Sequence, residues 1–260
     1  MQGLNILDLS DNCPQLLAQR DEELAFAAQC LARFSYGMSH ELLAPVNTLN
    51  KLLNLFKEEA IERLDEDSEE LLDMIMTSAK RTLEVTQGLQ EFSRYSQAPD
   101  KLEQIATGDV VCNVLEQMQA DIDQKKAVVT IGELPDALAT ADRLHQLFFQ
   151  LIKNALLYVS TDTGSPQLFI DGYKADNTVT FTVADQGIGV DPDNAQSVFT
   201  VFKRLHARSD YEGAGLGLSV CKQIVSSLNG RIWVSTDQQK GATIHVRLPT
   251  SSPQHKDIKT

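Results

Sequence analysis

A single histidine on a predicted long helix is the first residue of this chain that could do chemistry. Apolar residues around it recur at steps of three, four or seven and indicate a helix with one buried face: Leu31, Phe34, Met38, Leu42, Leu49, Leu52 and Phe56. His40 lies roughly 200° around that helix from Met38, at ~100° per residue, so its imidazole is predicted to face solvent. A neutral imidazole is a nucleophile near neutral pH, and Glu41 beside it could orient the ring or take its proton. Taken alone, the stretch favours the competing interpretation, a surface histidine on a bundle helix.

An asparagine on another predicted helix, about Ala141 to Tyr158, is a candidate metal ligand. Asn154 follows apolar residues at helical spacing, so a polar amide sits on or beside an apolar face. Its side-chain oxygen is a hard ligand of the kind that Mg²⁺ accepts, and Mg²⁺ usually binds few protein groups besides phosphate and water. A hydrogen-bonded core asparagine is the competing interpretation, and Asn154 in isolation favours it.

A glycine-containing segment directly after a predicted strand could contact a ligand through its backbone. The segment runs from Asp185 to Gly189, with Gly187 between them. Glycines at alternate positions permit close approach, and the Asp185 carboxylate could accept a hydrogen bond from an exocyclic amine such as that of adenine. A tight turn after a strand explains the same residues equally well.

A second glycine-rich segment opens a predicted helix. It runs from Gly213 to Leu218 and includes Gly215 and Gly217. Free N–H groups and the dipole at a helix N-terminus favour phosphate. A P-loop would end in Gly-Lys-Ser/Thr, and no strand leads into the segment as a dinucleotide fingerprint requires. A flexible loop with a helix cap is the alternative that the glycine density disfavours.

Two long helices in the N-terminal part position His40. The first is predicted from about Asp21 to Ile61 and contains Pro45, which removes a backbone donor and is expected to bend the helix just after His40. An acidic turn joins it to a second helix, about Ser68 to Tyr95, whose apolar side carries Leu72, Ile75, Ala79, Leu83 and Phe92. An antiparallel hairpin of this kind cannot bury its stripe alone. We therefore predict a dimer that forms a four-helix bundle.

The rest of the chain mixes helices and strands. Helices are predicted at Gly108–Lys126, Ala141–Tyr158 and Gly217–Leu228, and strands at Val128–Ile131, Leu168–Tyr173, Val179–Ala184, Ile232–Ser235 and Ala242–Leu248. Pairs of successive strands favour an α+β two-layer sandwich, with helices on one face of a sheet, over a doubly wound βαβ fold. The predicted organisation is a lead-in at 1–20, a helical hairpin at 21–98, the α+β domain at 99–250 and a polar tail at 251–260.

Composition narrows the range of partners. A net charge of -13 argues against binding to nucleic acid or to an anionic membrane surface. No apolar run approaches the ~20 residues needed to cross a bilayer, and the N-terminus lacks the pattern of a signal peptide. A soluble cytoplasmic protein without membrane insertion is expected. The four cysteines lack CxxC spacing, so neither a zinc site nor a disulfide framework is expected.

Together and in this order, the segments resemble the catalytic core of a two-component histidine kinase over about residues 25 to 250. Ser39, His40, Glu41 and Pro45 are similar to the phosphoacceptor box, Asn154 to the N box, Asp185, Gly187 and Gly189 to the first glycine box, and Gly213, Gly215 and Gly217 to the second. Phe199 and Phe202 resemble the phenylalanine box, and Gly241, Ala242 and Thr243 the final glycine segment.

The resemblance implies a dimerisation and histidine-phosphotransfer hairpin followed by an ATP-binding domain of the Bergerat (GHKL) type. It implies that Asn154 holds Mg²⁺, that Asp185 binds adenine, that Tyr158 flanks the base and that Lys203 or Arg204 reaches phosphate. The His40 imidazole would attack the γ-phosphoryl group of ATP with Glu41 as base, and would then pass the phosphoryl group to an aspartate of a separate response regulator. The implied partners are a second copy of the chain, a receiver domain and an unidentified sensor or input protein.

Three residues depart from the family pattern. Leu43 and Ala44 stand where the family usually has Arg-Thr, and Ala44 lies one helical turn after His40, on the same face. Alanine cannot orient a water molecule, so weak phosphatase activity toward the regulator is predicted. Leu157 replaces a basic residue that is common after the N-box pair, which removes one possible phosphate contact.

Two other classes of function remain open. A pseudokinase or signalling scaffold could bind nucleotide and dock a regulator without phosphorylating itself, and the three departures are its basis. An ATP-driven conformational enzyme of the topoisomerase or chaperone type would share the Bergerat fold. Such an enzyme does not need the His40 helix, so the pattern favours the active kinase.

Overall fold

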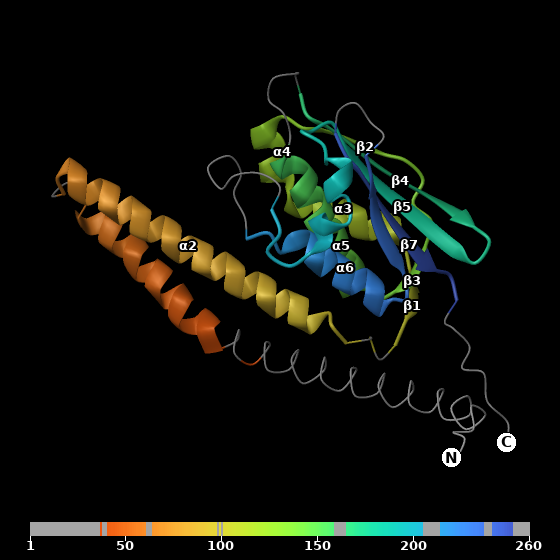
Figure 1. Cartoon of the computed structure of the whole chain (residues 1–260), viewed down its shortest axis with the longest axis horizontal. Coiled ribbons are helices and arrows are strands. Elements are labelled where there is room, and N and C mark those ends of the chain that lie inside the picture. The colour runs from red at the N-terminus through yellow and green to blue at the C-terminus, as the bar shows by residue number, and fades with distance from the viewer. Residues whose placement is uncertain are drawn as a thin grey trace, which may run out of the picture.

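The computed structural model describes residues 37, 41–60, 64–97, 99, 101–158, 165–204, 214–236 and 241–251. A helical hairpin projects from an α+β domain, and the hairpin packs against that domain near the end of its second helix (Figure 1). None of the helices in these residues combines the length and apolar content needed to span a membrane.

The hairpin consists of a helix at residues 41–60 and α2, Glu66–Arg94. Asp65 caps α2 by accepting a hydrogen bond from the Ser68 N–H at 3.0 Å, and acidic residues fill the first turn, where the helix dipole favours them. The two helices contact each other through Lys57 and Asp73, 2.7 Å apart, and through Nδ2 of Asn50, which donates to the Ala79 carbonyl at 3.4 Å. The first helix continues through Pro45.

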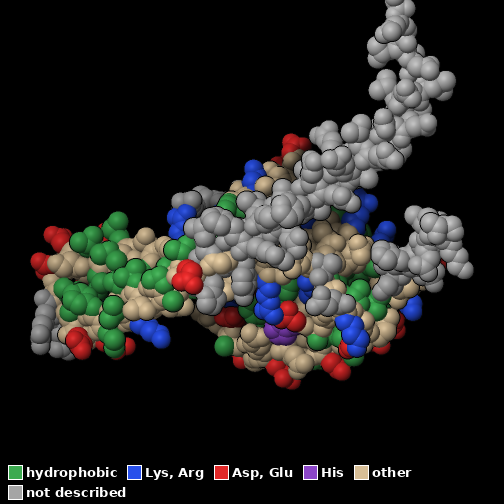
Figure 2. Space-filling model, turned by 90° about the horizontal axis from the view of Figure 1, so that it is seen from below, with side chains coloured by type: hydrophobic (Ala, Val, Ile, Leu, Met, Phe, Trp, Pro, Cys, Tyr) green, Lys and Arg blue, Asp and Glu red, His purple; other side chains and the backbone are tan. Residues whose placement is uncertain are grey.

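Many apolar side chains of the hairpin are open to solvent in the single chain. Those that are about half exposed or more are Leu42, Leu49, Leu52, Leu55, Phe56, Leu71, Met74 and Ile75. Figure 2 shows hydrophobic side chains gathered over much of the face of the hairpin seen in that view. A patch of this kind marks an interaction surface, so the hairpin alone does not complete its core.

The α+β domain is built from a five-stranded sheet and a separate two-stranded one. Its elements are β1 Glu103–Ile105, α3 Thr107–Gln117, α4 Gln119–Lys125, β2 Val128–Ile131, β3 Ala137–Ala139, α5 Ala141–Leu157, β4 Gln167–Ala175, β5 Thr178–Asp185, 3₁₀ turns at Pro192–Asn194 and Ser197–Phe199, α6 Gly217–Ser227, β6 Arg231–Ser235 and β7 Thr243–Pro249. The larger sheet has the order β2-β4-β5-β7-β6 and is antiparallel except for the β2–β4 pair. Strands β1 and β3 form the small sheet.

The helices lie on one face of the larger sheet, and the core fills the space between the two layers (Figure 1). Strand β4 alternates exposed and buried residues along most of its length, as expected for a sheet covered on one side. Helix α5 carries the opposing apolar stripe, and Phe148 meets Phe181 of β5 edge to face with ring centroids 5.6 Å apart. The predicted two-layer α+β fold after a helical hairpin is confirmed.

Two details differ from the prediction. The helix predicted at 108–126 is broken at Met118 into α3 and α4. Residues four apart drift by about 40° per step around a straight helix, and the break keeps Val114, Met118 and Ile122 all buried. Strands β1 and β3 were not predicted, because three residues are too few for alternation to show.

Candidate functional site

A cavity of about 470 Å³ lies where α2, α5, the N-terminus of α6 and the segment after β5 meet. Both glycine-rich segments and the face of α5 that carries Asn154 line it. Of the residues predicted for a site, the cavity wall includes Asn154, Tyr158, Asp185, Gly189, Lys203, Arg204, Gly215, Gly217 and Leu218.

Asp185 ends β5 and is the buried carboxylate of this cavity. Its Oδ1 accepts hydrogen bonds from the N–H groups of Gly187 at 2.8 Å and Ala242 at 3.2 Å. Both bonds end on one oxygen, so Oδ2 remains able to accept from a ligand. Burial raises the pKa of Asp185, against the effect of the two N–H donors. The side chain is thus held rigidly as a hydrogen-bond acceptor.

Gly187 is required by a close approach of two chain segments. A Cβ at position 187 would overlap the carbonyl oxygen of Tyr158, and the next N–H, that of Ile188, donates to the same carbonyl at 3.1 Å. This contact joins the end of α5 to the turn after β5. Gly189 has φ +76°, which favours glycine, and lies against Gly241. Gly187 therefore supports the cavity without lining it.

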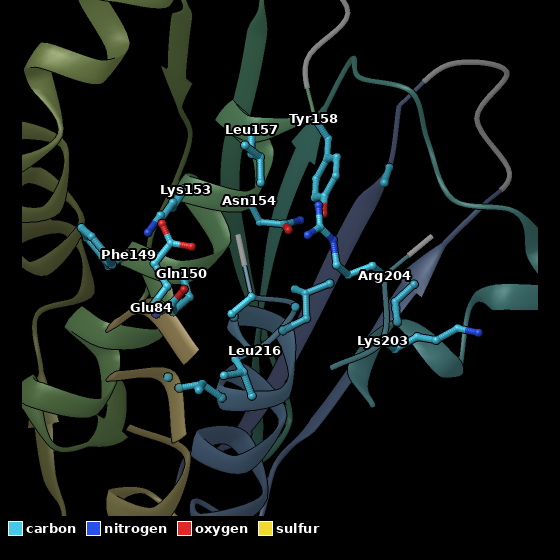
Figure 3. Close-up of a pocket in the computed structure, with 18 of the residues that line it drawn as sticks. Glu84, Phe149, Gln150, Lys153, Asn154, Leu157, Tyr158, Lys203, Arg204 and Leu216 are labelled. Carbon is cyan, nitrogen blue, oxygen red and sulfur yellow. The ribbon is translucent and has the colours of Figure 1, made fainter. Parts of the chain in front are cut away.

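One face of α5 contributes polar groups at a spacing of four. Gln150, Asn154 and Tyr158 line the cavity, and Figure 3 shows the Asn154 amide between the other labelled side chains. Asn154 provides one hard oxygen. The described residues contain no cluster of three His, Cys, Asp or Glu side chains that could bind a metal. This donor set fits Mg²⁺ only as an ion that brings phosphate and water as its other ligands.

Arg204 and Lys203 differ in direction. Figure 3 shows the Arg204 side chain pointing toward Asn154 and Tyr158, whereas Lys203 points away. Gly215, at φ +73°, packs against this segment: a Cβ there would lie 3.0 Å from Cγ of Arg204, and its carbonyl accepts from the Phe202 N–H at 3.1 Å. The second glycine segment therefore positions Arg204 as well as opening α6. Both cations line the cavity, and Arg204 is the one whose side chain points into it.

Sequence reasoning missed the wall that α2 contributes. Glu84, Gln87, Gly88 and Glu91 line the cavity at helical spacing. Glu91 accepts a hydrogen bond from Nε2 of Gln150 at 3.0 Å, and burial raises its pKa. A polar helix face is usually solvated, so no sequence signal indicated this contact. Lys153 and Gln150 of α5 were also missed, although they lie one residue and one turn before Asn154.

The other predicted site residues either lie outside the described residues or do not line the cavity. His40 and Gly213 lie outside the described residues. Glu41 is exposed on the hairpin and does not line the cavity. Phe199 is buried, and Phe202 is exposed with φ +61°.

Two family models match the chain. Residues 31–98 match the His Kinase A (phospho-acceptor) domain, and residues 139–252 match the histidine kinase-, DNA gyrase B- and HSP90-like ATPase. The chain belongs to the two-component histidine kinases. Within this family core, the first match covers the hairpin, whose α2 contributes one wall of the cavity, and the second contains the other walls, with Asp185 and Asn154.

The histidine kinase core is similar to larger proteins. It is 29% identical over 241 residues to phytochrome-like protein Cph1 of Synechocystis sp.. The alignment covers 90% of this chain and 32% of that protein. The chain spans about a third of the length of this and two cyanobacterial phytochromes that it also matches.

Solved structures share its fold. Full-length ShkA in complex with AMPPNP aligns with a TM-score of 0.64 at 22% identity, over 85% of this chain and 47% of ShkA. ThkA in complex with response regulator protein TrrA aligns with a TM-score of 0.57 at 16% identity, over 88% of this chain and 67% of ThkA.

Proposed function

We propose that the chain binds ATP in the cavity and phosphorylates its own His40. The observation that carries the proposal is the joint placement of a buried carboxylate acceptor, an inward-pointing guanidinium and a helix N-terminus around one cavity. Asp185 would accept from the adenine amine, while Arg204 and the N–H groups at Gly217 would bind phosphate oxygens. Tyr158 would flank the base.

The proposed reaction is an in-line displacement at the γ-phosphorus. An imidazole nitrogen of His40 forms a bond to phosphorus, the bond from phosphorus to the β,γ-bridging oxygen breaks, and ADP leaves with the electron pair. Glu41, adjacent to His40, would take the imidazole proton. Asn154 would hold Mg²⁺, which neutralises charge on the phosphate oxygens when it is bound.

The proposed partners follow from the hairpin. Its exposed apolar face would pair with that of a second copy, because a four-helix bundle buries both stripes. The phosphoryl group would then pass to an aspartate of a response regulator. The family match to a phospho-acceptor domain and the likeness to ThkA, whose structure is a complex with a response regulator, support this proposal. The input would come from a sensor or an input protein, and we propose a cytoplasmic location for the kinase.

The deciding test is incorporation of label from γ-labelled ATP with Mg²⁺. The unmodified chain should acquire acid-labile, alkali-stable label, and His40→Gln should acquire none. His145→Gln, outside the cavity, should match the unmodified chain. Calorimetry with AMPPNP should give equal affinities for all three. No label together with tight AMPPNP binding would favour the nucleotide-binding scaffold, which the apolar Leu157 in the cavity wall keeps as the second candidate. No AMPPNP binding at all would refute both.

A further inference from the structure

The end of α2 is built into the ATP-binding domain rather than linked to it loosely. Tyr95 is 3% exposed and belongs to the domain core, and its hydroxyl donates to Oδ2 of Asp142 at 3.0 Å. Arg94 pairs with Oδ1 of the same carboxylate at 3.1 Å. The last turn of α2 is therefore fixed to the first turn of α5.

Arg143 extends this attachment into the segment after α2. Its buried guanidinium donates to the carbonyls of Tyr95 at 3.3 Å and Gln97 at 2.6 Å, and to Oγ of Ser227 at 2.6 Å. It also lies over the Tyr95 ring at 5.3 Å. Moving the segment would leave a buried cation without its acceptors, which is costly. Residues 95–97 are thus unsuited to act as a hinge between the hairpin and the ATP-binding domain, although their sequence is typical of a domain boundary.

The part of α2 that bends more easily lies earlier in the helix. Thr82 donates its hydroxyl to the Ser78 carbonyl at 3.0 Å, and Thr86 donates to the Thr82 carbonyl at 2.7 Å. Such bonds to the residue four before weaken and bend helices. Gly88 comes two residues after Thr86, and glycine is the least favourable helix residue apart from proline. The two threonine bonds and Gly88 together lower the resistance of this part of α2 to bending.

Gly88 is also where α2 approaches the second glycine segment most closely. A Cβ at position 88 would lie 2.5 Å from Cδ1 and 2.9 Å from Cβ of Leu216. Glu84 and Gln87, which precede Gly88, line the cavity from the hairpin side, whereas Glu91 follows it. A bend at Gly88 would therefore change the distance of Glu84 and Gln87 from the rest of the cavity.

We propose that Gly88 is the pivot between the hairpin and the ATP-binding domain, and that Arg143 clamps residues 89–97 to the domain so that they move as one body. Nucleotide phosphates would repel Glu84 on the hairpin side of the pivot, so a bound nucleotide biases the bend. This last step rests on the proposed function, whereas the position of the pivot does not.

Spin-label distance measurements separate this pivot from a hinge at 96–100. Labels at Gln90 and Lys174, in a background with the native cysteines replaced by alanine, should give one narrow distribution with and without AMPPNP. Labels at Arg81 and Lys174 should give a broad distribution, or one that shifts with AMPPNP. Broadening or a shift of the Gln90–Lys174 pair would overturn the proposal, as would narrow, unshifted distributions for both pairs.

Two variants test the residues themselves. Gly88→Ala, whose added Cβ would meet Leu216, should both narrow and shift the Arg81–Lys174 distribution, whereas Gly108→Ala, where an added Cβ meets nothing within 4 Å, should leave it unchanged. Arg143→Ala should broaden the Gln90–Lys174 distribution. Equal distributions for Gly88→Ala and the unmodified chain would overturn the pivot. Calorimetry on each sample separates failure of the proposed function from failure of the pivot. Absent AMPPNP binding would count against the proposed function, and the distributions measured without nucleotide would still test the pivot.

Discussion

Replacing Asp185 by asparagine should greatly weaken adenine binding while leaving the fold intact. An amide that keeps its oxygen on the N–H groups of Gly187 and Ala242 retains both structural hydrogen bonds. Its NH₂ group then takes the position of the carboxylate oxygen that would accept from adenine. Two hydrogen-bond donors, this NH₂ group and the adenine amine, would therefore face each other. A hydrogen bond to a charged group contributes about 1.5–3 kcal/mol, or roughly 10- to 150-fold in affinity. The opposed donor adds to this loss, so we expect AMPPNP affinity to fall ~100-fold or more.

The same substitution should not destabilise the empty protein at neutral pH. Because burial raises the pKa of Asp185, the folded state binds its proton more tightly than the unfolded chain does. Its contribution to stability is therefore favourable below the unfolded pKa, about 4, and is lost as pH rises through the folded pKa. Asparagine removes that loss. The variant's unfolding temperature should equal or exceed that of the unmodified protein at pH 7, and the difference should shrink toward pH 4.

Calorimetry with AMPPNP and with a guanine analogue, together with thermal unfolding at several pH values, tests both halves of this prediction. Asp171→Asn is the matched control, since Asp171 is exposed on β4, outside the cavity, and also accepts from a backbone N–H. It should bind AMPPNP like the unmodified protein. Tight AMPPNP binding by Asp185→Asn, within threefold of the unmodified protein, would refute the acceptor role. If Asp185→Asn lost much stability at pH 7, the conclusion that burial of the charged Asp185 carboxylate destabilises the empty protein would be wrong.

Three further predictions concern other parts of the core. Arg204→Met should weaken AMPPNP binding about tenfold, by the ~1.5 kcal/mol of one charge-assisted hydrogen bond, whereas Lys203→Met should change it less than threefold; equal effects in calorimetry would contradict the side-chain directions. Ala44→Thr should raise the rate at which the protein with MgADP dephosphorylates a response regulator, and an unmodified protein that is already fast would contradict the role given to Ala44. Phe148→Ala should lower the unfolding free energy by ~3–5 kcal/mol, measured in urea, because Phe148 is fully buried against Phe181; a loss below ~1 kcal/mol would contradict the packing.

The parts of the site that the sequence could predict are those that each lie within a short segment. Asp185 ends a strand whose alternation is visible, and the glycines after it mark a segment that either approaches a ligand closely or turns tightly. Gly187 is explained only by the structure, because the carbonyl that excludes a Cβ belongs to Tyr158, nearly thirty residues earlier. The choice between Lys203 and Arg204 likewise depends on a backbone contact with Gly215. Local patterns indicate which segments meet a ligand, and long-range packing decides which atoms do.

The attachment of α2 to the domain was invisible for a related reason. Ser96, Pro99 and Asp100 have the composition of a loop, and that composition is present whether or not the loop is clamped. Arg143 gives no sequence signal because its acceptors are backbone carbonyls, which every residue carries. The same holds for Gly88, whose close neighbour Leu216 is far away along the chain.

Helix α2 serves two surfaces at once, and their angular separation lets both operate together. At ~100° per residue, the exposed apolar residues Leu71, Met74 and Ile75 centre on one side, and the cavity residues from Glu84 to Glu91 centre roughly 140° away. A second copy that covers the apolar side therefore leaves the cavity wall free. The apolar side also ends well before Gly88, so a bend there need not break the dimer contact. Dimerisation and movement of the ATP-binding domain are thus compatible on one helix, because they use different faces and different lengths of it.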